Sequence, residues 1–181
     1  MKEQSVTITL KKQQIVNDVS VQCGVIGRTL QKSPESEEQA AEIMTPDDVE
    51  TKPIVARSIV EAWGEVKKVC QRYLSAGRVS DDNRLEGIAT KTTTEGGEEV
   101  TTYGEFVLSL TMPASFNIGL TETVKSNAHR MIVDYTMRAV LADQWPEKAA
   151  EYERLYAADI ENLRASLRAR LRMTRRAVDW S

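Results

Sequence analysis

The fold of this chain is decided by residues 119–171, which have the sequence GLTETVKSNAHRMIVDYTMRAVLADQWPEKAAEYERLYAADIENLRASLRARL. Apolar residues recur on both sides of Trp145-Pro146 at steps of three and four, the spacing of one face of an α-helix. Proline suits the first turn of a following helix, so this pair marks a sharp corner. We therefore predict antiparallel helices, from about Gly119 to Gln144 and from Pro146 onward. In the second helix the predicted inner face carries Ala149, Tyr152, Tyr156, Ile160, Leu163, Leu167 and Leu171.

Three further elements are predicted upstream of this helix pair. Apolar residues alternate with threonines over residues 5–10, which is the period of a half-buried strand. Steps of three and four between Ile15 and Leu30 predict a helix directly after it. A longer helix is predicted from Pro53 to Gly77, with proline in its first turn and glycine at its end.

A β-hairpin is predicted between the second and third helices. Its strands are residues 85–93 and 98–112, joined by Thr94, Glu95, Gly96 and Gly97, where two glycines permit the positive φ angles of a tight turn. The outer half, residues 91–102, has few large apolar side chains, so we expect the hairpin to project and its turn to contact a neighbour. The predicted fold class is mainly α: an antiparallel bundle of about four helices, with a projecting β-hairpin and a short N-terminal strand.

The chain divides into four segments by composition. Residues 1–32 hold the N-terminal strand and helix, and residues 53–173 hold the helical bundle with its hairpin at 85–112. Between them, residues 33–52 form an acidic linker, with seven acids and no basic residue from 33 to 51. This linker is interpreted as solvated, and the alternative is an acidic arm that docks on a basic neighbour. Residues 174–181 form a C-terminal arm.

Length and charge narrow the classes of function. The 181 residues fit one domain, and a net charge of -3 is too small to indicate a nucleic-acid or membrane partner. No stretch approaches 18 apolar residues, and residues 1–10 lack the apolar core of a signal peptide. We therefore expect no membrane partner, and a protein that stays in the compartment where it is made or in an assembly built there.

No residue pattern points to catalysis, a metal or a cofactor. Cys23 and Cys70 have no CxxC partner and are expected to be buried free thiols. The single histidine, His129, is expected to be a surface or partly buried residue, because neither Ser126 nor Asp134 is expected to share its helix face. The loop at residues 81–83 has three side-chain oxygens but breaks the pattern of a calcium loop, and Gly96-Gly97 has no lysine or helix to form a phosphate cradle. We therefore expect no enzyme but a protein that binds other proteins.

The basic C-terminal end supplies the candidate binding residues. Acids at the start of the last helix and arginines at its end suit the helix dipole, which explains part of the pattern. It does not explain arginines beyond the last apolar position, nor a tryptophan in the tail, and Trp with Arg is the composition of a binding anchor. Arginine forks bind carboxylates or phosphates. The predicted partner-binding residues are Arg168, Arg172, Arg175, Arg176 and Trp180.

The order of helix, polar loop, long helix, hairpin, helix, Trp-Pro, helix and arginine-rich exit resembles the head–tail connector (neck adaptor, or head-completion) proteins of tailed bacteriophages. The resemblance covers roughly residues 53–181 and includes the stretches FVLSL (106–110) and LRARL (167–171). It implies a ring of copies of this chain, commonly dodecameric, that lines the DNA exit channel and catalyses nothing. The implied partners are the portal and the tail or stopper proteins, and the implied location is a virion assembled in the cytoplasm of a bacterial host.

The alternative is a nucleic-acid-binding or regulatory helical protein that uses the arginines of the last helix on phosphates. Binding by six arginines should weaken steeply with salt, with a log–log slope of about -5 on duplex DNA. The acidic net charge and the absence of a helix-turn-helix spacing count against this alternative.

Overall fold

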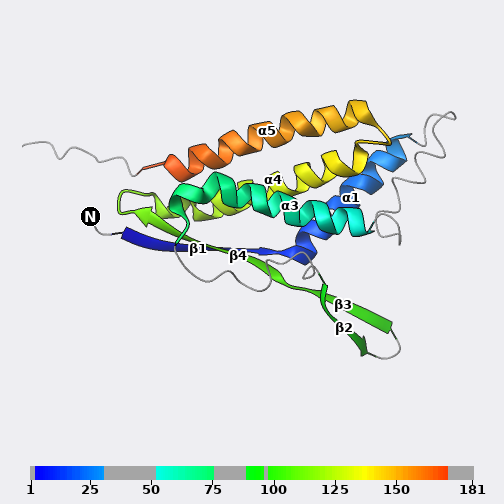
Figure 1. Cartoon of the computed structure of the whole chain (residues 1–181), viewed down its shortest axis with the longest axis horizontal. Coiled ribbons are helices and arrows are strands. Elements are labelled where there is room, and N and C mark those ends of the chain that lie inside the picture. The colour runs from blue at the N-terminus through cyan, green and yellow to red at the C-terminus, as the bar shows by residue number, and fades with distance from the viewer. Residues whose placement is uncertain (1–2, 31–51, 76–88, 96–97, 171–181) are drawn as a thin grey trace, which may run out of the picture.

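The computed structural model of this chain describes residues 3–30, 52–75, 89–95 and 98–170. It confirms the predicted fold class, a mainly α fold with four helices and an antiparallel hairpin in the described part (Figure 1). The elements in order are β1 (Glu3–Lys11), α1 (Lys12–Leu30), α3 (Lys52–Cys70), the 3-10 turn η2 (Gln71–Tyr73), β2 (Ala89–Glu95), β3 (Glu98–Tyr103), β4 (Glu105–Pro113), the 3-10 turn η4 (Ile118–Leu120), α4 (Thr121–Leu141) and α5 (Pro146–Arg168).

Helix α4 lies at the centre of the bundle and contacts α1, α3, α5 and β1. The predicted corner at Trp145-Pro146 makes α4 and α5 antiparallel, and α3 also runs opposite to α4 (Figure 1). The Trp145 N–H donates to the Leu141 carbonyl at 2.8 Å, which ends α4, and Pro146 begins α5. The inner face of α5 passes through Asp159, which is 1% exposed, and not through the predicted Ile160, which is only half-buried. The 3.6-residue period places position 159, three after Tyr156 and four before Leu163, on that face.

A two-stranded antiparallel sheet of β1 and β4 lies against α3 and α4, in a register that runs from Glu3 opposite Pro113 to Lys11 opposite Glu105. Every second residue faces the helices and is buried, namely Val6, Ile8 and Leu10 on β1 and Phe106, Leu108, Leu110 and Met112 on β4. The Phe106 ring stacks on the buried indole of Trp63 in α3, with centroids 4.9 Å apart. The predicted N-terminal strand is thus confirmed, and its partner lies about a hundred residues downstream.

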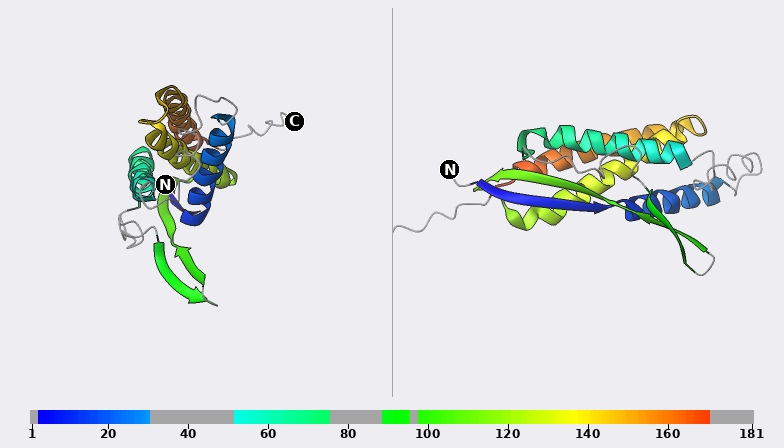
Figure 2. Two further views of the ribbon diagram at one scale, coloured as in Figure 1. Left: turned by 90° about the vertical axis from the view of Figure 1, so that its right-hand side faces the viewer. Right: turned by 60° about the horizontal axis from the view of Figure 1, so that its bottom comes forward.

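The predicted strand at residues 98–112 is two strands, and the prediction of one continuous strand is wrong. Gly104 separates β3, which pairs with β2, from β4, which pairs with β1. The apolar half of the segment is therefore covered by β1 and the bundle, while the polar half forms a hairpin of its own. The base of that hairpin contacts α1 through β3, and its far end points away from the helices, so the prediction of a projecting hairpin is confirmed (Figures 1 and 2). Of its predicted contact residues, Thr94 and Glu95 end β2, whereas Gly96 and Gly97 lie outside the described residues.

Two helices end earlier than predicted because their chains leave the helix to reach other elements. α3 ends at Cys70, well before Gly77, and after η2 the Ser75 N–H donates to the Ser109 carbonyl of β4 at 3.0 Å. α5 ends at Arg168, and Arg170 forms an isolated β-bridge with Phe116. Leu171, the acidic linker at 33–52 (apart from Lys52), the loop at 81–83 and the arm at 174–181 lie outside the described residues.

Candidate functional site

The predicted arginines are only partly within the described residues. Arg168 is exposed in the last turn of α5. Arg164 forms an ion pair with Glu161 at 2.6 Å, and the Arg170 guanidinium donates to the carbonyls of residues 167 and 169 of its own chain. The remaining predicted binding residues, Arg172, Arg175, Arg176 and Trp180, lie outside the described residues.

Both cysteines are buried free thiols, as predicted, Cys23 in α1 and Cys70 at the end of α3. Burial raises the pKa of the Cys23 thiol to about 11 and that of the Cys70 thiol to about 12. Both therefore stay protonated at neutral pH, and a thiol in that state is a poor nucleophile and a poor metal ligand.

His129 is partly buried, as predicted, but it has a partner that the sequence did not reveal. Its Nε2 lies 2.6 Å from a carboxylate oxygen of Asp18 in α1, 111 residues away. The prediction that Ser126 does not share the helix face of His129 is wrong. Ser126 lies three residues earlier, hence on the same helix face, and lines one hollow with His129, whereas Asp134 lines a second hollow with it. The pair is a contact between α1 and α4.

The hollow that His129 shares with Ser126 is the larger one, with a volume of about 600 Å³. It lies where β1 meets the starts of α1, β4 and α4, and its lining is polar and open, with Glu105, Glu122 and Lys125 on its walls. Glu122 and Lys125 are paired with each other at 3.7 Å. This hollow has no buried unsatisfied group, and we assign it no ligand.

The second hollow, of about 380 Å³, lies between α1, α4 and α5, and we call it the acidic cleft. Its walls carry polar groups from all three helices, and exposed Val21 and Leu155 form its rim. The lining residues are Asp18, Val21, Gln22, His129, Arg130, Val133, Asp134, Tyr152 and Leu155.

Two buried carboxyl groups meet beside this cleft. Asp134 of α4, which lines it, is 7% exposed, and Asp159 of α5 is 1% exposed. Arg130 Nη2 lies 3.5 Å from Asp159 Oδ1, too far and too exposed to satisfy the carboxylate. Burial, a hydrogen bond with Asp159 and the charge of Asp159 raise the pKa of Asp134 to about 7. At about pH 7 Asp134 is therefore protonated in about half of the molecules.

The cleft is rich in hydrogen-bond acceptors and poor in donors. Among the described residues, no group donates a hydrogen bond to the buried Oε1 of Gln22, and the buried oxygens of Asp159 can accept one from Asp134 only when Asp134 is protonated. Burial and the neighbouring Asp134 raise the pKa of the Tyr152 hydroxyl to about 12, so that side chain stays neutral. An unpaired buried acceptor costs about 1–3 kcal/mol, and a charged one more. The geometry is therefore suited to a group that brings several donors and a positive charge.

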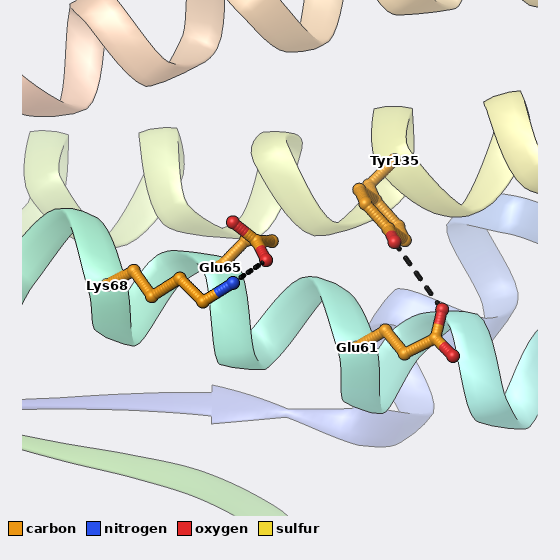
Figure 3. Close-up of polar contacts among 4 residues, drawn as sticks. All are labelled: Glu61, Glu65, Lys68 and Tyr135. Atoms are coloured by element: carbon orange, nitrogen blue, oxygen red, sulfur yellow. Dashed lines mark hydrogen bonds and ion pairs between the residues drawn. The ribbon is translucent and has the colours of Figure 1, made fainter.

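Polar side chains also link α3, α4 and α5, and these side chains have hydrogen-bond or ion-pair partners. Tyr135 of α4 donates its hydroxyl to Glu61 of α3 at 3.4 Å, and Lys68 pairs with Glu65 on the outer face of α3 (Figure 3). The Arg138 guanidinium lies 4.5 Å from the centre of the Tyr135 ring and 2.5 Å from the Glu153 carboxylate of α5. These groups pair with one another, so this seam helps to hold α3, α4 and α5 together.

Comparisons with known proteins add no relative. No protein-family model, no curated protein and no solved structure matches this chain. Within the described ranges, no three or more His, Cys, Asp or Glu side chains gather closely enough to hold a metal ion. In the same ranges, no helix combines the length and the apolar character needed to cross a membrane. The function is therefore argued from the geometry.

Proposed function

We propose that this chain is a structural subunit that assembles with copies of itself into a ring, of the kind found between portal and tail in the connectors of tailed bacteriophages. The observation that carries this proposal is the β2–β3 hairpin. The hairpin directly precedes β4 in the chain but extends away from the core. In the described part of the chain its two strands pair only with each other. A two-stranded hairpin is marginally stable in water, and its open edges are ready to pair with another chain.

The arrangement of the helices also supports the proposal. A long helix, a hairpin, two antiparallel helices and an arginine-rich exit follow one another in the order on which the resemblance to connector proteins rests. The arginines of α5 support the alternative of phosphate binding less well, because Arg164 and Arg170 are engaged within their own helix end.

The test is the mass of the full chain in solution, alone and mixed with a portal protein, measured by light scattering and native mass spectrometry. The matched variant has a shorter hairpin. Thr93 and Val100 lie opposite each other, so Asn-Gly can replace residues 94–99 as a two-residue turn without a change of register. We expect the full chain to form rings and the shortened chain to stay folded with assembly weakened about tenfold or more.

Two results would count against the proposal. One is a full chain that remains monomeric under both conditions, and the other is a shortened chain that assembles as well as the full one. Binding of labelled duplex DNA at low salt by such a monomer would favour the nucleic-acid alternative instead.

A further inference from the structure

The acidic cleft remains unexplained by the packing of the bundle. Gln22 of α1 and Asp134 of α4 line it, and the buried Asp159 of α5, which does not line it, lies beside Asp134. Both aspartates are more than nine-tenths buried, and Arg130 is the one cation near them in the described residues. When both carboxyl groups are ionised, they carry a combined charge of -2, and Arg130 contributes +1. The remaining charge of -1 favours the binding of one further cation.

The chemistry of the acceptors selects the class of ligand. A guanidinium group carries five N–H donors and a permanent positive charge, and it matches carboxylate and amide oxygens that converge from different sides. The rim adds a second requirement, because Val21 and Leu155 are exposed apolar side chains, 62% and 46% exposed respectively. An arginine that buries its aliphatic stem against such a rim, beside an aromatic ring, meets both requirements.

This chain carries a segment of that composition. Residues 171–181, with the sequence LRMTRRAVDWS, contain three arginines, no lysine, one acid and one tryptophan. Eleven residues in extended form reach about 36 Å, which is long enough to leave one subunit and cross the surface of the next. α5 ends at Arg168, and Ala169 and Arg170 lead the chain into this segment.

We propose that the acidic cleft binds an arginine side chain from residues 171–181 of a second copy of this chain, with Trp180 placed to cover the apolar rim. This inference rests on the proposed function, since it names the surface that receives the arm of a neighbour in the assembly. In it, Asp134 and Gln22, which line the cleft, accept N–H groups of the guanidinium, and the Asp159 carboxylate beside Asp134 adds negative charge.

The first experiment measures the concentration at half-assembly of the full chain by sedimentation velocity. Asp134→Asn keeps the shape of the side chain and removes its charge, and we expect it to raise that concentration about tenfold or more. Asp143→Asn is the matched control, because Asp143 is exposed at the corner between α4 and α5 and should leave the concentration unchanged. The double variant Arg175→Gln, Arg176→Gln should lose as much as Asp134→Asn, and combining all three changes should lose little more.

The second experiment identifies the occupant directly. Val21 in the full chain is replaced by the photocrosslinker p-benzoylphenylalanine, and isotope-labelled and unlabelled copies are mixed before irradiation. We expect crosslinks from position 21 of one copy to residues 171–181 of another, and none to those residues from a crosslinker at Ile118, which is 61% exposed but does not line the cleft.

The outcomes separate this inference from the proposed function. Crosslinks to the arm of the same copy, or none to any arm, would overturn the inference, as would an Asp134→Asn chain that assembles within twofold of the unchanged chain. If rings still form in those cases, the proposed function survives and only the cleft assignment is lost. A chain that stays monomeric alone and with a portal protein would overturn both.

Discussion

Asp134→Asn should make the isolated subunit more stable at pH 8, although it removes a buried charged group. In the native state the carboxyl group of Asp134 has a pKa raised from 3.8 to about 7, so the native protein binds this proton more tightly than the unfolded chain. Stability conferred by that proton is complete at about pH 4, falls as the pH rises toward 7, and is lost above it. Asparagine does not titrate, so the variant should lack this loss.

The size of the effect follows from the shift. Each pKa unit corresponds to 1.36 kcal/mol, so the whole shift corresponds to about 4 kcal/mol as an upper limit. Asp134 lines an open cleft where water screens part of its charge, and Arg130 opposes the shift, so we expect about 2 kcal/mol at pH 8. The other ionisable groups around the pair are Asp159 and Tyr152 of α5, Cys23 and Asp18 of α1, and His129 of α4. All of them are present in both proteins.

The assay is urea unfolding between pH 4 and pH 8, followed by tryptophan fluorescence on dilute protein, where subunits are dissociated. The quantity of interest is the difference in free energy of unfolding between Asp134→Asn and the unchanged chain. It should be close to zero or slightly negative at pH 4 and should rise to about +2 kcal/mol at pH 8. The exposed control Asp143→Asn should show no such rise. A difference that is flat with pH, or an Asp134→Asn chain that is less stable at pH 8, would refute the reasoning.

Three further predictions concern other parts of the fold. Trp63→Ala should cost about 3–5 kcal/mol in urea unfolding, because Trp63 is 1% exposed and stacks on Phe106, whereas Trp63→Phe should cost clearly less. Deletion of residues 174–181 should leave the thermal unfolding of the bundle unchanged while abolishing ring formation, which circular dichroism and light scattering would show; unchanged assembly would contradict the role given to the arm. Cys23 and Cys70 should react with a thiol reagent only as fast as the protein opens, because burial raises the pKa values of both thiols, and fast labelling of the native protein would contradict this.

The helices could be predicted from the sequence because their information is local. A stripe at steps of three and four, a proline in the first turn and a Trp-Pro corner are visible within one helix length. The alternation over residues 5–10 identified β1 in the same way. What could not be predicted was which strands pair. The partner of β1 lies about a hundred residues away, and a single glycine, Gly104, divides one apparent strand between two sheets.

The acidic cleft was missed although its sequence carried one signal. In α5 the buried positions step through Tyr156, Asp159 and Leu163, so a carboxylate stands in an apolar stripe. The apolar pattern predicts Ile160, the neighbouring residue, at that place, because an apolar residue at a buried position needs no further explanation. The other acceptors, Gln22 and Asp134, approach Asp159 only through the packing of three helices, which no local pattern reveals. The same reason hid the pairing of His129 with Asp18.

The buried acceptors of the acidic cleft destabilise the isolated subunit, and the proposed assembly gives a physical reason for their presence. In an isolated subunit the buried Oε1 of Gln22 lacks a donor among the described residues, Asp159 can accept a hydrogen bond from Asp134 only when Asp134 is protonated, and the raised pKa of Asp134 shows that its ionised form is disfavoured. A guanidinium group from a neighbouring copy would donate hydrogen bonds in the cleft and favour the ionised form of Asp134. The free energy that the buried acceptors cost the isolated subunit would then be recovered on assembly. One substitution should therefore act with opposite signs: Asp134→Asn stabilises the subunit and weakens the ring. A purely structural role for the carboxyl pair predicts no such opposition, because a more stable subunit would then assemble at least as well as the unchanged one.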